Sequence, residues 1–470
     1  MKTFRAAVLV LIFALVHSGV AFAQSQPAAT GGKIQIPPFS KHVLDNGLTV
    51  VLMEYHRLPL VELQLTVRGG SSVDPDTLVG LASMTAGLLK KGTTARSATK
   101  IAEDIDFIGG TLNAGAGVDR FGVSSEFLKK DLDAGLTLFA EVVLSPTFPQ
   151  EELDRERSQR LATIEQYKEE PSSVAGLYFA RRVYGNHPYG NPAIGTAASL
   201  KKMTRDAVSR FYKETFLPNN AILVVVGDFH ANEMLEKVKQ VFGGWQKGTP
   251  RIASASAPTA MKGRKVVVVS KPDVTQTQIR IGNVGIDVRN PDWFAVQVAN
   301  SILGNGFTSR LVEEIRVKRS LSYGARSAFP AYERGGMYLI STFTKNPTTR
   351  ETIDVALEEV RKYREKGATK EELLKAQNYL AGDFARDLQA PENLASNLSE
   401  MIFYGFPNDH LETYVQRLKN VTLDDVKRVV QKYFLLDDVI IMVVTNPKET
   451  QDSLAGLGPI EVVPLEQAVQ

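Results

Sequence analysis

The histidines and cysteines of this chain are the residues from which a metal site or a nucleophilic centre would be built. The chain has no cysteine, which excludes disulfides, thiolate zinc ligands and cysteine nucleophiles. His187 precedes Pro188 and is expected to have a structural role in a loop. The histidines beyond residue 23 show no pair spaced to share one helix face or one hairpin, and they are His42, His56, His187, His230 and His410. This inventory predicts that the chain holds no zinc site of its own.

The composition argues against several other classes of function. The sequence has no Gly-x-Ser-x-Gly elbow, so a serine-hydrolase triad is not predicted. The net charge is only +3, and the basic residues neither form a block nor interleave with aromatic residues, which excludes a nucleic-acid surface. With 470 residues, of which 43% are hydrophobic, the chain is long enough for two large domains with separate cores.

The N-terminus has the pattern of a secretory signal peptide. Lys2 and Arg5 form a short positive region, residues 6–16 are almost wholly apolar, and residues 21–23 read Ala-Phe-Ala, the small-x-small pattern that signal peptidase recognises. The apolar run is too short to span roughly 30 Å of hydrocarbon, and no basic stop-transfer cluster follows it. We therefore expect cleavage after Ala23 and a periplasmic or secreted protein without a membrane anchor. The absence of cysteine suits an oxidising compartment.

Strand and helix signals follow a polar N-terminal spacer at residues 24–40. Residues 48–53 and 61–67 have strand character, and in the second segment apolar and polar side chains alternate. Residues 97–108 and 150–169 carry apolar side chains every three or four positions, which is typical of helices that pack on a core. This mixture predicts an α+β protein rich in both elements.

An internal repeat divides the chain into two similar halves. The segment that begins at Leu200 aligns without gaps with the segment that begins at Leu418, an offset of 218 residues. Thr204 and Thr422 correspond, and each is expected to cap a helix that is followed by a turn and a buried strand. The same offset carries Val50 onto a valine in the first strand of the second half. A repeat of this length predicts two homologous domains.

The composition between the halves sets the expected domain boundaries. Residues 246–263 are rich in serine, alanine, proline and glycine and poor in large apolar residues, as linkers are. We therefore predict a first domain over residues 41–245, a second domain over residues 264–450 and a tail over residues 451–470.

Five segments, in order along the chain, carry a family pattern. Residues 44–53 (LDNGLTVVLM), 185–196 (GNHPYGNPAIGT) and 217–228 fall in the first half, and residues 303–311 (LGNGFTSRL) and 315–323 (IRVKRSLSY) fall in the second. They resemble the first strand, the central loop, the closing strand, the glycine loop and a helix end of the pitrilysin/insulinase family of zinc peptidases, especially the branch of the mitochondrial processing peptidase. The resemblance implies two homologous domains, each a mainly antiparallel sheet packed with helices, that together form half of a clamshell.

The resemblance also implies a zinc motif, and its residues are missing here. Active members carry His-x-x-Glu-His on a helix of the first domain, where the histidines bind zinc, the glutamate acts as base and a further downstream glutamate completes the ligands. The matching segment is residues 80–93 (GLASMTAGLLKKGT), in which the histidine positions fall on Ser83 and Gly87 and the base position on Ala86. The downstream position falls on Thr163. These residues are poor zinc ligands or lack a ligating atom, so we expect no metal in this chain.

Two other residues match positions that the family uses for catalysis in two-chain members. There, one subunit holds zinc, and the other supplies an arginine and a tyrosine that contact the peptide and the developing oxyanion. These positions fall on Arg316 and Tyr323, which are donors suited to charge growing on a carbonyl oxygen. Their spacing alone favours a solvated arginine on a helix over residues 309–319 and a tyrosine packed beneath the next strand, and it is the family resemblance that favours the catalytic role.

A further segment resembles the family's substrate-binding edge strand. Residues 109–114 read GGTLNA and match the strand to which a peptide adds by main-chain pairing, so Asn113 is a candidate substrate contact. Without zinc in the same chain, this strand also fits a purely structural role in the sheet.

Together these features predict the non-catalytic subunit of a periplasmic, heterodimeric zinc peptidase. The chain would pair with a zinc-bearing homologue, bind peptide substrates and be inactive alone. Two alternatives remain from the sequence. One is a peptide-binding or structural assembly protein on the same fold, and the other is an active metallopeptidase with an unrecognised metal site.

Overall fold

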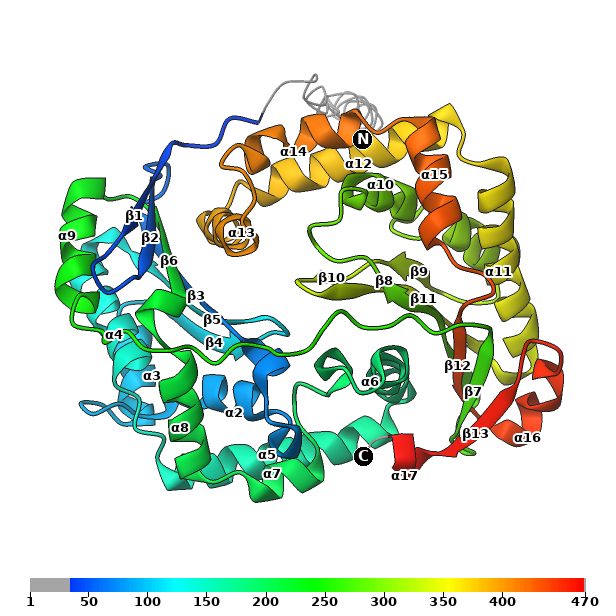
Figure 1. Ribbon diagram of the computed structural model, residues 1–470, viewed down its shortest axis with the longest axis horizontal. Coiled ribbons are helices and arrows are strands. Elements are labelled where there is room, and N and C mark those ends of the chain that lie inside the picture. The colour runs from blue at the N-terminus through cyan, green and yellow to red at the C-terminus, as the bar shows by residue number, and fades with distance from the viewer. Residues whose placement is uncertain (1–33, 469–470) are drawn as a thin grey trace, which may run out of the picture. The chain divides into compact units, whose positions relative to one another are not determined.

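The computed structural model describes residues 34–468, in which two β-sheets are each covered by helices (Figure 1). The predicted signal peptide, residues 1–23, and most of the predicted spacer, residues 24–40, lie outside the described residues. The α+β class is confirmed. Among the described residues, no helix combines the length and the apolar content that crossing a membrane requires.

The first sheet is built from six strands of the N-terminal half. In spatial order they are β1 (Phe39–Val43), β2 (Thr49–Glu54), β6 (Ala221–Gly227), β3 (Leu60–Arg68), β5 (Arg120–Leu128) and β4 (Thr111–Ala116). Neighbouring strands are antiparallel except for β2 and β6, which run parallel. The strands predicted at residues 48–53 and 61–67 are therefore confirmed as β2 and β3.

The second sheet repeats this plan with strands from the C-terminal half. In spatial order it contains β10 (Ala331–Tyr332), β11 (Gly335–Lys345), β8 (Gln276–Gly285), β12 (Ile440–Thr445), β7 (Lys265–Ser270) and β13 (Ile460–Pro464), with β9 (Ala325–Ala328) also paired to β11. β12 runs parallel to β7 as β6 does to β2, which agrees with the internal repeat. β13 lies in the segment predicted as a tail and adds a second parallel strand beside β7.

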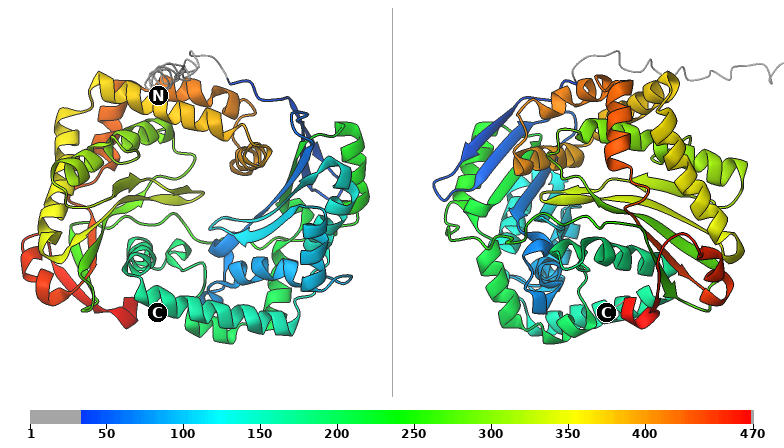
Figure 2. Two further views of the ribbon diagram at one scale, coloured as in Figure 1. Left: turned by 180° about the vertical axis from the view of Figure 1, so that it is seen from behind. Right: turned by 45° about the vertical axis from the view of Figure 1, so that its right-hand side comes forward.

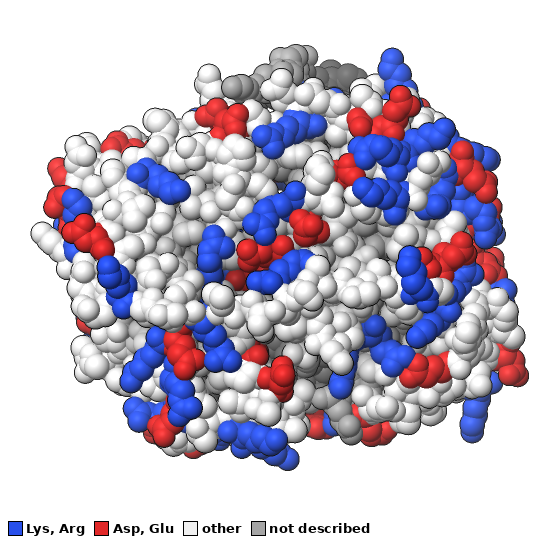
Figure 3. All heavy atoms as spheres, in the orientation of Figure 1, with Lys and Arg blue, Asp and Glu red and all other residues white. Residues whose placement is uncertain are grey.

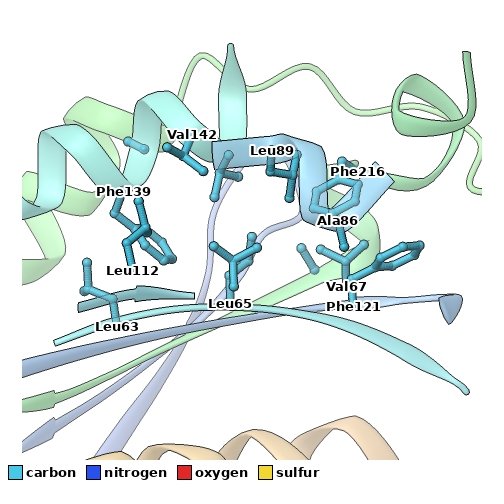
Figure 4. Packing of buried hydrophobic residues seen from close by; sticks show 14 of the residues in the cluster. Leu63, Leu65, Val67, Ala86, Leu89, Leu112, Phe121, Phe139, Val142 and Phe216 are labelled. Carbon is cyan, nitrogen blue, oxygen red and sulfur yellow. The ribbon is translucent and has the colours of Figure 1, made fainter. Parts of the chain in front are cut away.

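Helices of the first half cover one face of the first sheet. They are α2 (Leu81–Leu88), α3 (Ala98–Phe107), α4 (Leu132–Leu144), α5 (Gln150–Glu169), α7 (Ala197–Lys202), α8 (Arg205–Thr215) and α9 (Ala231–Phe242). Alternate residues of β3 point into this core, so Leu63, Leu65 and Val67 meet apolar side chains of the helices (Figure 4). The side chain of Thr204 accepts a hydrogen bond from the backbone N–H of Ala207 at 3.2 Å and caps α8, as the sequence predicts.

Helices of the second half cover the corresponding face of the second sheet. They are α10 (Trp293–Leu303), α11 (Thr349–Lys366), α12 (Lys370–Asp387), α14 (His410–Lys419) and α15 (Leu423–Tyr433), followed by the short helices α16 (Pro447–Thr450) and α17 (Leu465–Ala468). Thr422 and Asp425 form a capping box at the start of α15. Both copies of the repeat therefore begin with a threonine-capped helix, and each leads into a buried strand.

Two further helices are exchanged between the halves. α6 (Pro171–Tyr184) belongs to the first half but packs on β8 and β12 of the second sheet, and α13 (Pro391–Tyr404) belongs to the second half but packs on β3 and β6 of the first (Figure 2). Both have 14 residues and begin with proline at the first helical turn, where its missing N–H costs nothing. Each helix buries apolar residues on the second face of a sheet.

This exchange ties the two halves of the sequence into one body. Residues 246–263, predicted as a linker, contain no helix or strand. The described residues, 34–468, nevertheless belong to one compact unit. The boundaries at residues 41–245 and 264–450 therefore stay predictions drawn from the repeat.

Candidate functional site

Helix α2 carries the positions where the zinc motif would stand, and its start is firmly fixed. The Asp74 carboxylate accepts hydrogen bonds from the backbone N–H groups of Gly80 and Ala82, both at 2.7 Å. Gly80 has φ 89°, and a Cβ added to it would lie 2.5 Å from the Cα of Gly195. Only glycine satisfies both the left-handed backbone and this close approach. The orientation of α2, and of the side chains on it, is therefore set by its first turn.

A guanidinium lies against the two histidine positions. Arg160 of α5 donates from Nη1 to the Oγ of Ser83 at 3.0 Å and from Nη2 to the carbonyl oxygen of Ser83 at 2.9 Å. Its Nε donates to the Oε1 of Glu156 at 2.8 Å. A Cβ added to Gly87 would lie 3.3 Å from Nη2 of this arginine. A side-chain cation thus lies on the helix face where the family resemblance places the two histidine ligands.

The side chain at the base position, Ala86, faces the hydrophobic core and not Arg160. Ala86 is fully buried and packs with Val67, Phe121 and Phe216 in the core between α2 and the sheet (Figure 4). A glutamate at this position would place a carboxylate among hydrocarbon side chains, where an unpaired charge is strongly disfavoured. The small apolar residue therefore suits this core and supplies no proton acceptor.

The downstream ligand position makes a local contact. The hydroxyl of Thr163 donates to the carbonyl oxygen of Gln159 at 3.0 Å, within α5 itself. The α5 side chain that reaches α2 is Arg160. Ser83, Ala86, Gly87 and Thr163 thus do not fit Zn²⁺, because none has a strong ligating atom and a cation already lies beside two of them. Within residues 34–468, no group of three His, Cys, Asp or Glu side chains is arranged to hold a metal ion.

The structure brings two histidines closer than the sequence indicated. The ring centroids of His56 and His230 are 6.4 Å apart. His56 Nδ1 lies 2.6 Å from Asp228 Oδ1 and its Nε2 lies 3.1 Å from Glu54 Oε2. The hydrogen bond to Asp228, and then that to Glu54, raises the pKa of His56. Both ring nitrogens are therefore engaged by carboxylates in an exposed ion-pair cluster.

The loop that contains His187 has a structural role, as the sequence predicts. His187 Nε2 donates to the carbonyl oxygen of Ser256 at 2.8 Å. Nearby, the Tyr189 hydroxyl donates to Asp119 Oδ1 at 2.7 Å, and the backbone N–H of Glu333 donates to Asp119 Oδ2 at 2.7 Å. Because Glu333 comes from the second half, this network joins the two halves.

Arg316 and Tyr323 are both presented to solvent. Arg316 lies in the π-helix η7 (Val312–Lys318), where the sequence predicted a regular helix over residues 309–319. Its guanidinium carbon lies 5.7 Å from the ring centroid of Phe307, which is 83% exposed. Tyr323 is 84% exposed, so the interpretation that packed it beneath a strand is wrong. Within the described part of the chain, no hydrogen bond or ion pair engages either side chain.

The segment that contains Asn113 is an edge strand. β4 pairs only with β5 in the first sheet and lies beside α2. Thr111 and Asn113 are exposed on it, whereas Leu112 between them is buried against the core. Lys90 Nζ donates to the carbonyl oxygen of Leu112 at 3.4 Å. The other main-chain groups on this edge offer a place where an extended peptide can pair.

The comparisons with known proteins decide the family. The model for Insulinase (Peptidase family M16) matches residues 49–197, and that for the Peptidase M16 inactive domain matches residues 202–380. A crystal structure described as a peptidase M16 inactive domain from Pseudomonas fluorescens is 30% identical, covers 87% of this chain and 97% of its own, and superposes with a TM-score of 0.82. The chain belongs to peptidase family M16.

Two other M16 proteins bear on what this chain does. The "Non-peptidase homolog YmxG" of Helicobacter pylori is 25% identical over 407 residues, which cover 85% of this chain and 92% of that protein. The periplasmic protease PqqL of Escherichia coli shares the fold, with a TM-score of 0.75 and 17% identity, over 91% of this chain but only 50% of its own. One PqqL chain is thus long enough to contain the M16 body described here twice.

Sequence reasoning missed Arg160 and Glu156 in this M16 protein. It compared only the four positions where the family keeps zinc chemistry, and Arg160 is not one of them. The available signal was a glutamate and an arginine four residues apart on α5, a common helical ion pair. Nothing in that spacing indicates that the arginine also contacts α2.

Charged side chains of both signs are mixed on the face drawn in Figure 3. There, lysine and arginine side chains are interspersed with aspartate and glutamate. This mixture agrees with the small net charge of the chain, and no continuous basic stripe crosses this face.

Proposed function

We propose that this chain is the non-catalytic subunit of a heterodimeric M16 zinc peptidase and lends Arg316 and Tyr323 to the active site of a zinc-bearing homologue. The observation that carries the proposal is that the zinc position is occupied by a side chain while the two candidate donors are exposed. The zinc position of this chain is filled by Arg160, whereas Arg316 and Tyr323 are exposed and make no hydrogen bond or ion pair within the described residues.

The chemistry of these two residues suits a helper role. A guanidinium and a phenol donate hydrogen bonds to the negative charge that develops on a carbonyl oxygen during peptide cleavage. A partner that covered the exposed ring of Phe307 would also desolvate the Arg316 guanidinium beside it and strengthen its interactions. The PqqL likeness supports a two-body arrangement, since that chain is twice as long as the part matched here.

The proposal extends to the cofactor, the ligands and the compartment. Zinc belongs to the partner subunit, and peptides are the substrates of the pair. The edge strand β4 and Asn113 are the proposed peptide contacts in this chain. The signal-peptide pattern of residues 1–23 supports export to the periplasm or beyond.

Removing either donor is expected to slow the paired enzyme. The chain alone should not cleave peptides, and mixing it with a zinc-bearing homologue from the same organism should give cleavage that EDTA abolishes. In the pair, Arg316→Ala or Tyr323→Phe is expected to lower kcat/KM by about 100- to 1000-fold, the range for loss of one oxyanion donor. Steady-state kinetics on a quenched fluorescent peptide measure this effect.

Arg319→Ala provides the matched control for these variants. Arg319 is an exposed arginine at the end of the same helix, and it lies 3.7 Å from the Glu351 carboxylate and 3.9 Å from that of Glu314. Its loss should leave kcat/KM unchanged. Unchanged kinetics for both Arg316→Ala and Tyr323→Phe would contradict the helper role and favour a peptide-binding or assembly protein. EDTA-sensitive cleavage by the isolated chain would instead indicate an active metallopeptidase.

A further inference from the structure

A cavity lies among four helices of the second half. It has a volume of about 590 Å³ and is lined by residues of α10, α12, α13 and α14 and of the loops beside them. This volume is in the range of pockets that hold small organic ligands. None of the site residues predicted from the sequence lines it. The cavity is therefore not part of the candidate site described above.

Aromatic rings form much of the wall of this cavity. Phe384 of α12 and Tyr414 of α14 are stacked with their ring centroids 3.8 Å apart. Phe294 of α10 lies edge-on to Tyr414 at 5.2 Å, and Phe406 is stacked on His410 at 4.3 Å. All five side chains are half-buried. Because the rings line a cavity and keep part of their surface accessible, an apolar group that entered would remove aromatic surface from water.

An acidic residue without a cationic partner also lines the cavity. Asp383, Asp387 and Glu400 are all in its wall, and burial, followed by these three carboxylates, raises the pKa of the Tyr414 hydroxyl. The carboxylates of Asp383 and Glu400 already pair with arginines. Asp387 accepts a hydrogen bond from the Asn397 amide at 3.0 Å, and within the described residues no cation pairs with it. Asp387 is therefore available to a bound cation.

A basic residue without an acidic partner lines the same cavity. Of the two arginines in the wall, Arg289 lies 3.6 Å from the carboxylate of Glu333. The guanidinium carbon of Arg417 lies 5.7 Å from the ring centroid of Phe294, and no hydrogen bond or ion pair engages this group within residues 34–468. Burial, and then the charge of Arg417, lower the pKa of His410 to about 4, so this ring is neutral at pH 7. Arg417 is therefore available to a bound anion.

The stacked rings stand between these two charges. α12 and α14 run antiparallel, since Phe384 meets Tyr414 while Gln377, two turns earlier on α12, donates to carbonyl oxygens at the end of α14. Asp387 and Arg417 each follow one of the stacked rings by three residues, so they lie to opposite sides of it. At 1.5 Å per residue, they are about 9 Å apart along the helices.

We propose that this cavity binds a free tripeptide with a bulky apolar side chain, a zwitterion whose opposite charges stand at the two ends of an apolar body. Its ammonium group lies against Asp387, its carboxylate lies against Arg417, and its apolar side chain covers the aromatic rings between them. The ends of an extended tripeptide are about 10 Å apart, which matches the separation of the two charges. The inference goes beyond the proposed helper role and does not depend on it, because neither Arg316 nor Tyr323 lines the cavity.

Capping the ends of a tripeptide tests each charge separately. We expect the full chain, without a partner, to bind Ala-Phe-Ala with free ends at pH 7 in a calorimetric titration. N-acetylation and C-amidation of this peptide should each weaken binding about tenfold, since each removes one charge-assisted contact. Ala-Ser-Ala should also bind about tenfold more weakly, because it cannot cover the rings.

Variants that remove one charge connect each end of the peptide with its residue. In Arg417→Gln, the amidated peptide and the free acid should bind equally, whereas N-acetylation should still weaken binding about tenfold. In Asp387→Asn, the acetylated peptide and the free amine should bind equally, whereas C-amidation should keep its effect. Arg361→Gln and Asp354→Asn are matched controls on α11, which does not line the cavity, and they should behave as the unmodified chain.

Tryptophan fluorescence locates the bound peptide. Trp293 lines the cavity, and the other tryptophan of the chain is Trp245 in the first half. In Trp245→Phe, Ala-Phe-Ala should therefore change the emission of Trp293 with the affinity found by calorimetry. Failure of the free tripeptide to bind, or equal binding of the free and capped peptides, would overturn the inference. Capping effects that persist in both charge variants, or binding that leaves the emission of Trp293 unchanged, would overturn it as well.

Discussion

The variant Ser83→His/Gly87→His is expected to bind zinc only when Arg160 is also replaced by alanine. The two histidines would stand four residues apart on one face of α2, the spacing that lets both reach one metal. With Arg160 present, its guanidinium lies where the metal would bind, only 3.3 Å from a Cβ at position 87. Repulsion between unit charges 4 Å apart is about 4 kcal/mol near a protein surface, and Zn²⁺ doubles it.

Removing Arg160 also frees a third ligand. The Glu156 carboxylate loses its partner and lies 3.5 Å from the same Cβ position, so it can complete a site of two histidines and one carboxylate. The triple variant is therefore expected to bind zinc at least about a thousandfold more tightly than the double variant, equivalent to roughly 4 kcal/mol. Calorimetry and the visible absorption of a Co²⁺ substitute both measure this difference.

Two controls separate metal binding from misfolding. Arg160→Ala alone should bind no zinc and should lose about 1–3 kcal/mol of stability, because the Ser83 carbonyl and the Glu156 carboxylate lose a charged donor. Near-UV circular dichroism should show that every variant keeps its tertiary packing. Equal zinc affinity of the double and triple variants would show that the Arg160 guanidinium moves aside and does not prevent zinc binding.

Replacement of Glu62 by glutamine is expected to change how stability depends on pH. The pKa of Glu62 is raised from 4.5 to about 9, first by burial and then by Glu126 and Glu392. Below pH 4.5 both the folded and the unfolded chain hold this proton. Between pH 4.5 and 9 the unfolded chain releases it while the folded chain keeps it. The contribution of Glu62 to stability is therefore fully present below pH 4.5 and is lost as pH rises toward 9.

Glutamine keeps the shape of the side chain but cannot ionise, so it removes this loss. Relative to the unmodified chain, Glu62→Gln should gain about 2–4 kcal/mol more in the free energy of unfolding at pH 8 than at pH 5. Urea denaturation at the two pH values measures the difference. Glu392→Gln is the matched control, because it removes an exposed acid near Glu62 and should shift stability by less than about 0.5 kcal/mol. Parallel pH profiles for Glu62→Gln and the unmodified chain would contradict this account.

Much of the fold could be predicted from local patterns. The helix at residues 150–169 matches α5, and the strand at residues 61–67 lies within β3, because the period of apolar side chains reports which face of an element is buried. The repeat predicted two similar halves, and the parallel pairs β2–β6 and β7–β12 agree with it. The exchange of α6 and α13 was not predicted, since an amphipathic helix shows that it packs but not on which sheet.

For the candidate site too, some features could be predicted from the sequence and others depend on the tertiary structure. By itself, the sequence determined that zinc chemistry is missing at Ser83, Ala86 and Gly87, because no fold can turn a hydroxyl, a methyl group or a hydrogen atom into an imidazole or a carboxylate. The tertiary structure decided what stands there instead, since Arg160 reaches Ser83 from 77 residues away.

The surroundings of Glu62 and the exposure of Tyr323 also depend on tertiary structure. Glu392 comes to Glu62 on a helix from the other half, so no local pattern joins the two. The family pattern singled out Tyr323, but only the three-dimensional arrangement leaves its ring exposed. Residue types and spacings report local chemistry, whereas the partners of a charge depend on which elements pack together across the whole chain.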